Sequence, residues 1–344
     1  MKAMRLTGIR QMEMLETPDP QIVDDTDVLI RMKVVGICGS DVHYYTTGRI
    51  GDQVCEYPYT VGHESAGVVE AVGPAVTSVK PGDRIAVEPA VSCGKCDQCL
   101  SHRSHTCRNL KFLGCPGQIE GCLSEYIVMP QECCYKIPDD MTLDQAAVSE
   151  PLSIGFYAVK QSIDIKCKTA AILGAGPIGL SVLLAAKYME AGKIYMTDKI
   201  DARVDTALQN GADWAGNPDS QNIVKEISQA EPLLLDCVFE CCGEQEAIDQ
   251  AVELLKPGGK LMFVGIPEVD RISFDISKIR RKEICIQNVR RQNECVQETL
   301  DMIHSGKVSA DFMVTHRFDF ADSKKGFDMV DNYEDGVIKA MIDL

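Results

Sequence analysis

The stretch TAAILGAGPIGLSVLLAAKYMEAGKIYMTD, residues 169–198, decides the fold of the middle of this chain. The apolar run AAIL leads into the pattern Gly174, Gly176 and Gly179, an apolar helical segment follows, and a second short apolar run ends at Asp198. The first glycine permits a tight turn, the second lets a pyrophosphate approach the backbone, and the third lets the helix pack closely on the strand. The stretch therefore predicts a βαβ unit of a doubly wound, parallel α/β sheet of the Rossmann type.

Asp198 indicates which dinucleotide would bind. It ends the second strand, nineteen positions after the last glycine of the pattern, where a carboxylate accepts hydrogen bonds from the adenosine ribose hydroxyls and repels a 2′-phosphate. This favours NAD over NADP, although the nearby Lys199 and Arg203 could accommodate a phosphate. The pyrophosphate would lie at the helix N-terminus, beside Pro177 and Ile178. The alternative is a glycine turn that binds no dinucleotide.

The chain falls into two differently composed regions. Residues 1 to about 150 carry short runs rich in Val and Ile, broken by Gly and Pro, which predict a mostly β domain shaped as a partly closed barrel. From about residue 153 the pattern changes to alternating strands and helices. Further strands are expected at 235–240, 260–265 and 284–289, with a helix at 246–255.

After residue 293 the pattern changes again. A helix is expected at 294–305, and the runs VTHRFDF and IKAMIDL read as strands that rejoin the first domain. We therefore predict a mostly β domain of residues 1–152 and 293–344, and a nucleotide domain of residues 153–292.

Composition excludes several classes of function. Apolar residues make up 45% and charged residues 25% of 344 residues, values typical of a soluble globular protein. The 35 basic and 51 acidic residues give a net charge of −16, which repels nucleic acid and anionic lipid, so neither partner is expected. The N-terminal MKAMRLTGIRQMEM has no long apolar stretch, so no signal peptide or membrane anchor is expected. Sixteen cysteines without a leader then favour a reducing cytoplasm and no disulfides.

Four cysteines predict a structural zinc site. Cys93, Cys96, Cys99 and Cys107 stand in the run CGKCDQCLSHRSHTC. Two gaps of two residues and one of seven let a loop turn four thiolates inward as a tetrahedral all-sulfur shell. Such a shell has no open position for substrate. The alternative is a set of ordinary reduced cysteines on a surface loop.

A second set of residues predicts a reactive zinc. Cys38 lies in GICGSDVHYY, and His63 and Glu64 lie in VGHESAG. One sulfur, one nitrogen and one oxygen donor leave a fourth position open, as a catalytic zinc requires. Each residue alone could equally be a buried thiol, a core histidine or a surface glutamate, but as a set they favour a metal.

These motifs together resemble the zinc-dependent medium-chain alcohol dehydrogenases, most closely the sorbitol (L-iditol) and xylitol dehydrogenase branch. The resemblance extends over nearly the whole chain and rests on CGSDVHYYTTGRIGD (38–52), GHESAGVV (62–69), the four-cysteine run, SEPLSIG (149–155), GAGPIG (174–179) and VTHRF (314–318). It implies that the mostly β domain is GroES-like and that each chain holds two zinc ions, one catalytic and one structural.

The resemblance also implies roles for single residues. Cys38, His63 and Glu64 match the catalytic zinc ligands of the polyol branch, and Glu150 matches a carboxylate that holds the zinc-bound water or enters the coordination shell transiently. Ser40 matches the residue that touches the substrate oxygen. His43 matches a residue that relays the proton, and Asp41 one that orients His63. The residues assigned to the substrate pocket are Tyr44, Phe112, Glu150, Arg290 and Arg291. The residues assigned to the cofactor are Asp198 and Arg203 for the adenosine, and Val264, Gly265, Ile266, Asn288, Val289 and Arg290 for the nicotinamide half.

The activity implied by the resemblance is transfer of a hydride from a secondary alcohol of a polyol to NAD, giving a ketose. Arg291 departs from the branch, which usually carries tyrosine there, and a second guanidinium could prefer a carboxylate- or phosphate-bearing sugar. Threonine, 2,3-butanediol and alkyl alcohols remain alternative substrates, and a catalytically silent NAD-binding scaffold is the alternative from another class. The family also implies a homo-oligomer, a tetramer or a dimer.

Overall fold

The computed structural model describes all residues, 1–344, and divides into two compact units. One unit is Met1–Glu150 with Val296–Leu344, and the other is Pro151–Cys295. The boundaries predicted from the sequence differ from these by two or three residues. No helix has the length and apolar character needed to cross a membrane. The sixteen cysteines are free thiols.

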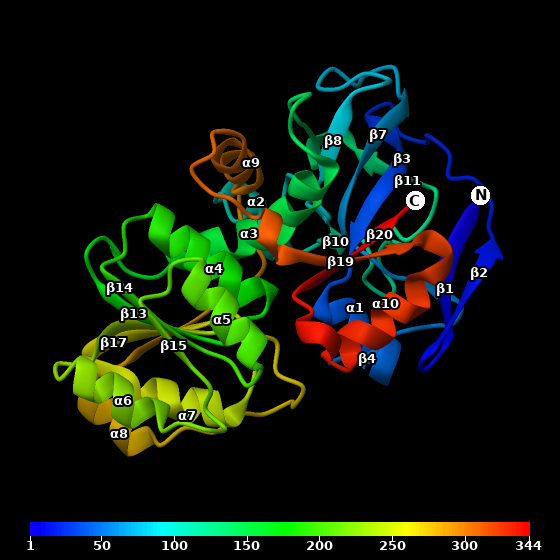
Figure 1. Cartoon of the computed structure of the whole chain (residues 1–344). Helices are drawn as coiled ribbons and strands as arrows, with labels where there is room; N and C mark the ends of the chain where they lie inside the picture. The colour runs from blue at the N-terminus through cyan, green and yellow to red at the C-terminus, as the bar shows by residue number, and fades with distance from the viewer. The chain divides into compact units, whose positions relative to one another are not determined.

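The first unit is built on a seven-stranded sheet with the order β12-β8-β7-β3-β20-β19, in which β11 also pairs with β3 (Figure 1). The alternation of buried and exposed side chains along the long strand β3 explains its central place, since one face packs on the core. The strands are β3 (Asp27–Gly36), β7 (Glu64–Val72), β8 (Arg84–Val87), β11 (Tyr126–Pro130), β12 (Cys134–Lys136), β19 (Val314–Asp319) and β20 (Lys339–Asp343).

Smaller elements complete this unit. The C-terminal strand β20 pairs antiparallel with β3, so the end of the chain completes the N-terminal sheet. The short sheets comprise β1 (Lys2–Gly8) with β2 (Gln11–Glu16) and β6 (Tyr59–Thr60), β4 (Arg49–Ile50) with β5 (Gln53–Val54), and β9 (Ala90–Val91) with β10 (Lys111–Phe112). The helices are α1 (Gly39–Thr47), α2 (Asp97–Leu100), α9 (Val296–His304) and α10 (Ser323–Asp331), and α3 (Leu143–Lys160) continues past Glu150.

The second unit is a six-stranded sheet, parallel throughout, with the order β15-β14-β13-β16-β17-β18. Figure 1 labels β13, β14, β15 and β17 of this sheet and the helices α4 to α8 of the same unit. Because both faces of such a sheet are covered by helices, the side chains of its inner strands β13, β14 and β16 are almost all buried, whereas the edge strand β18 has no buried residue. Its strands are β13 (Thr169–Leu173), β14 (Lys193–Thr197), β15 (Trp214–Gly216), β16 (Leu235–Glu240), β17 (Leu255–Phe263) and β18 (Cys285–Asn288). Its helices are α4 (Pro177–Tyr188), α5 (Asp201–Gln209), α6 (Ile223–Ala230), α7 (Gln245–Leu254) and α8 (Ile276–Lys282).

The glycine pattern has the predicted place between β13 and α4. Gly174 has φ +103°, a conformation that favours glycine. A side-chain carbon at Gly179 would lie 1.8 Å from the carbonyl oxygen of Gly174, so only glycine lets α4 pack this closely on the turn. The α/β class with a mostly β domain and a Rossmann-type domain, predicted from the sequence, is confirmed.

Candidate active site

Helix α1 positions Cys38, the first residue of the candidate catalytic set. Cys38 is the N-cap residue of α1, and its backbone N–H donates to Asp41 Oδ2 at 3.2 Å. Asp41 is fully buried, and its other oxygen accepts a hydrogen bond from the backbone N–H of Gly62 at 3.1 Å. One carboxylate therefore joins the segment that carries Cys38 to the segment that carries His63.

His63 lies between this carboxylate and Cys38. Gly62 has φ +99°, and the chain turns there before β7 begins at Glu64. His63 is buried, and its Nδ1 lies 3.3 Å from Asp41 Oδ1. Burial opposes protonation of the ring, but Asp41 and Cys38 outweigh it and raise the pKa of His63. Asp41 thus has the position for orienting His63 that the resemblance implies.

Lys339 is a site residue that the sequence analysis missed. Its side chain is 1% exposed, and Nζ lies 2.7 Å and 2.5 Å from the two carboxylate oxygens of Glu64 and donates to the carbonyl of Ile37 at 3.0 Å. A side-chain carbon at Gly36 would lie 2.6 Å from Glu64 Oε2, so this glycine makes room for the pair. The only sequence signal was a single lysine in the apolar strand IKAMIDL.

The three predicted donors converge. One ligand atom each from Cys38, His63 and Glu64 lies within 4.8 Å of the others. Glu150, the fourth candidate ligand, is not part of this group; it is buried, and its Oε2 has no hydrogen-bond partner. Burial raises the pKa of Glu150, which His63 partly opposes, and Glu64 and Glu88 raise it further, to about 8.

This set fits a divalent cation. Two cationic side chains, Lys339 and His63, interact here with four acidic side chains and a thiol: Asp41, Glu64, Glu88, Glu150 and Cys38. Buried carboxylates without enough counter-charge are unfavourable, and a metal ion would supply that charge. Sulfur, imidazole and carboxylate donors are a mixed set of the kind that zinc accepts at sites with an open position.

The remaining predicted residues of this unit lie on α1 and on strand β10. The Ser40 hydroxyl lies 3.4 Å from Cys38 Sγ, next to the donor set, and His43 follows on the same helix. Tyr44 is buried and its hydroxyl donates to Gln53 at 3.2 Å. The ring of Phe112 lies 5.3 Å from that of His63.

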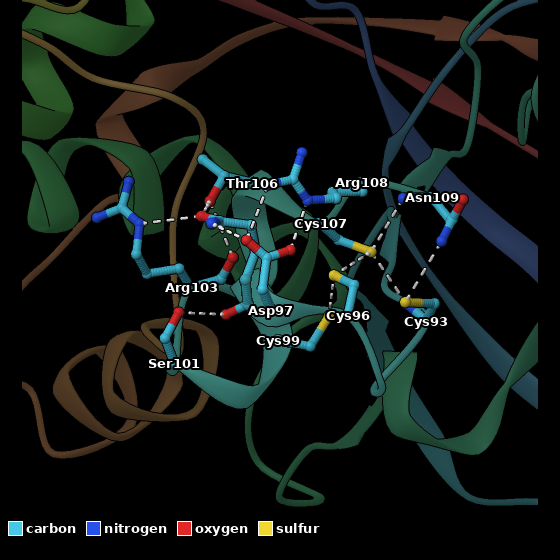
Figure 2. Close-up of polar contacts among 11 residues, drawn as sticks. Cys93, Cys96, Asp97, Cys99, Ser101, Arg103, Thr106, Cys107, Arg108 and Asn109 are labelled. Atoms are coloured by element: carbon cyan, nitrogen blue, oxygen red, sulfur yellow. Dashed lines mark hydrogen bonds and ion pairs between the residues drawn. The ribbon is translucent and has the colours of Figure 1, made fainter.

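The four cysteines of the predicted structural site also converge (Figure 2). Their sulfur atoms lie within 4.8 Å of one another, and those of Cys96 and Cys99 are 3.6 Å apart. Hydrogen bonds from the backbone of Lys95 and from Cys107 lower the pKa of Cys93 to about 6, whereas burial raises the pKa of Cys107 to about 11. Cys93 is therefore the residue of this pair that most readily forms the thiolate that binds zinc. The residues present fit a closed, all-sulfur zinc site.

An exposed ion pair between Asp97 and Arg108 links the two segments of this loop that carry the cysteines. Arg108 follows Cys107, and Asp97 follows Cys96; the guanidinium contacts both carboxylate oxygens, at 2.5 Å and 2.9 Å (Figure 2). Asn109 Nδ2 donates to Cys93 Sγ at 3.8 Å. The Asp97–Arg108 pair holds the ligand-bearing segments together without using a ligand atom, whereas Asn109 contacts the ligand atom Cys93 Sγ itself. The sequence analysis identified neither contact.

We expect Asp97→Asn to accelerate zinc loss from the four-cysteine site about three- to tenfold, because it removes the bidentate ion pair with Arg108. This pair is exposed and therefore of modest strength. Release of zinc to a coloured chelator measures this in a Cys38→Ser background, where only the four-cysteine site should hold zinc. Glu190→Gln, which removes the exposed ion pair with Lys166, is the control. An unchanged release rate in Asp97→Asn would contradict the expectation.

The predicted dinucleotide-binding residues of the second unit lie at the carboxyl ends of its strands. Asp198 follows β14, accepts a hydrogen bond from the backbone N–H of Ala175 at 2.7 Å, and thereby contacts the glycine turn. A side-chain carbon at Gly176 would meet only the guanidinium of the buried Arg203, at 3.6 Å, so the backbone is accessible to a phosphate. Residues 264–266 follow β17, and residues 288–291 comprise the last residue of β18 and the three after it, so both segments lie at the same carboxyl ends of the strands.

Comparisons with known proteins agree with these features. Residues 24–139 match the family model described as alcohol dehydrogenase GroES-like domain, and residues 177–305 match the model described as zinc-binding dehydrogenase. A sorbitol dehydrogenase of Bacillus subtilis (strain 168) is 35% identical over 343 residues, covering 99% of this chain and 97% of the relative.

Two solved structures have the same fold. An Escherichia coli oxidoreductase/dehydrogenase of unknown specificity has a TM-score of 0.94 and 33% identity, with 99% of this chain and 98% of that chain covered. A protein described as a short chain alcohol dehydrogenase from Escherichia coli CFT073, solved with NADH, has a TM-score of 0.91 and 28% identity, with 100% of this chain and 99% of that chain covered. The chain belongs to the zinc-dependent medium-chain alcohol dehydrogenase family and is an oxidoreductase of its sorbitol dehydrogenase-like branch.

Proposed function

We propose that this protein oxidises a secondary alcohol of a polyol or sugar-derived substrate to the ketone, with NAD as hydride acceptor. The convergence of Cys38, His63 and Glu64 on one point carries the proposal, because this mixed donor set leaves a coordination position for a substrate hydroxyl. A zinc ion held there would act as a Lewis acid and lower the pKa of the substrate hydroxyl.

The residues around the donor set have defined tasks in this reaction. Ser40, next to Cys38, accepts the proton of the substrate hydroxyl and passes it toward His43 on the same helix. Glu150, whose Oε2 has no hydrogen-bond partner, would hold a water molecule near a bound zinc ion. Asp41 fixes the orientation of His63, and Lys339 fixes that of Glu64.

NAD is the proposed cofactor because Asp198 lies at the glycine turn. Its carboxylate would receive the ribose hydroxyls and repel a 2′-phosphate. Solved relatives hold either cofactor, one NADH and another NADP, so the assignment rests on Asp198. Comparison of reduction rates with NAD and NADP tests it: at least a tenfold preference for NAD is expected, and a preference for NADP would contradict it.

The substrate class is tested by NADH formation on a panel of substrates: sorbitol, xylitol, a sugar acid, a sugar phosphate, threonine and 2,3-butanediol. We propose a neutral polyol, as in the sorbitol dehydrogenase from Bacillus subtilis. A preference for an anionic sugar would instead indicate that Arg291 binds the anionic group. If Arg291→Tyr then lost this preference, that role of Arg291 would be established. No turnover on the panel, with a single zinc per chain, would favour the silent scaffold.

We also propose a cytoplasmic homo-oligomer. The sixteen free cysteines suit a reducing compartment. Strand β18 is an edge strand of its sheet and pairs only with β17, so a second copy could extend the sheet there. A solution mass of four or two chains is expected from light scattering, and a monomer would contradict the proposal.

A further inference from the structure

Glu240 lies at the end of the central strand β16, where the loops of the dinucleotide site meet. It is fully buried. In the sheet it is the register partner of Leu173, the last residue before the glycine turn. Nothing in the sequence motifs assigns it a role.

The side chain of Glu240 organises the turn that follows it. Its Oε1 accepts hydrogen bonds from the backbone N–H groups of Cys242, at 2.8 Å, and Gly243, at 2.6 Å, and from the thiol of Cys242, at 3.1 Å. One buried backbone donor, that of Gly243, and two part-buried donors of Cys242 thus depend on a single acceptor. The buried N–H of Gly243 would be the most costly to leave unpaired.

This turn packs tightly between two segments that the proposed function assigns to the cofactor. A side-chain carbon at Gly174 would lie 3.2 Å from Cys242 Cβ, and one at Gly265 would lie 2.7 Å from the backbone N of Gly243. The carbonyl of Glu240 itself accepts from the backbone N–H groups of Val264 and Gly265, both at 2.9 Å. Displacement of the turn would therefore disturb both the glycine turn and the 264–266 segment.

We propose that Glu240 is a positioning residue for the dinucleotide site: its carboxylate fixes the 241–243 turn and, through it, the spacing between the glycine turn and residues 264–266. This rests on the proposed NAD-dependent function. Glu240 touches no reacting atom, so its effect falls on the affinity for the cofactor and not on the chemical step.

Titration of the full-length, zinc-loaded protein with NADH, followed by its fluorescence, tests the proposal. Glu240→Ala should weaken NADH binding about tenfold, because it leaves the donors of the turn without an acceptor. Glu240→Gln retains an acceptor oxygen and should restore affinity to within about threefold of wild type. With saturating NAD, kcat of Glu240→Ala should stay within about twofold of wild type.

Asp236→Asn is the matched control. Asp236 lies at the other end of the same strand, where it accepts from Thr169 and pairs with Lys256. Its loss should lower the melting temperature and leave NADH affinity unchanged. Equal weakening of NADH binding by Asp236→Asn and Glu240→Ala would contradict a specific role for Glu240.

Gly243→Ala provides a second test if Glu240→Ala does not fold. Gly243 has φ +79°, and a side-chain carbon there would lie 2.7 Å from the carbonyl oxygen of Ile266, so the substitution displaces the same turn. It should weaken NADH binding to a similar degree. If Glu240→Ala and Gly243→Ala bind NADH with wild-type affinity, the proposed role of Glu240 is wrong. If the wild-type protein itself binds no NADH, the proposed cofactor is wrong.

Discussion

Cys38→Ser is expected to reduce turnover roughly a thousandfold or more, since a Lewis-acidic metal supplies several kcal/mol of transition-state stabilisation. A serine hydroxyl is a poor replacement for a thiolate, because neutral oxygen binds zinc weakly beside the remaining imidazole and carboxylate. The variant should retain the fold, because the backbone N–H of residue 38 still donates to Asp41. NADH formation on the best substrate, with zinc content measured in parallel, checks the result.

Cys134→Ser is the matched control for this experiment. Cys134 is a buried thiol in β12 of the same unit and donates to the carbonyl of Pro130 at 3.6 Å. It belongs to neither donor set. We expect full zinc content and activity from this variant. Full turnover in Cys38→Ser would show that the metal assignment is wrong.

Lys339→Met should destabilise the metal-free protein by about 3–5 kcal/mol, the cost of leaving a buried carboxylate without its partner. This corresponds to a fall in melting temperature of roughly 10 °C for the unit concerned. The zinc-loaded protein should lose less stability, because Glu64 then has the metal as counter-charge. Thermal unfolding with and without zinc measures the difference.

Two further variants separate the ion pair from general effects of removing a lysine. Lys136→Met removes an exposed lysine that pairs with Asp83, so it should cost at most about 1 kcal/mol. Adding Glu64→Gln to Lys339→Met removes the unpaired charge and should recover stability in the metal-free protein. If Lys339→Met is no less stable than Lys136→Met, the buried pair does not stabilise the fold.

Local patterns in the sequence were sufficient for the α/β elements and for both donor sets. The strand predicted at 235–240 has those same ends as β16, because its side chains are almost all buried and Cys241 begins a turn. The zinc lobe was predicted because its ligands lie within fifteen residues, where spacing constrains geometry.

Contacts between distant parts of the chain were not predictable in this way. Lys339 and Glu64 are 275 positions apart, and their pairing follows only from β20 and β7 flanking β3 in the folded sheet. Strand β17 begins at Leu255, earlier than the predicted 260, because the segment at Pro257 and Gly258 continues as an irregular strand that Gly and Pro signals obscure. The role proposed for Glu240 likewise depends on loops brought together by the sheet.

Anomalous diffraction at the zinc edge, from crystals of the purified protein, tests the central claim most directly. The account predicts two peaks per chain, one between the four cysteine sulfurs and one within about 2.0–2.4 Å of the donor atoms of Cys38, His63 and Glu64. A protein that turns over substrate but shows only the peak at the four cysteines would contradict it.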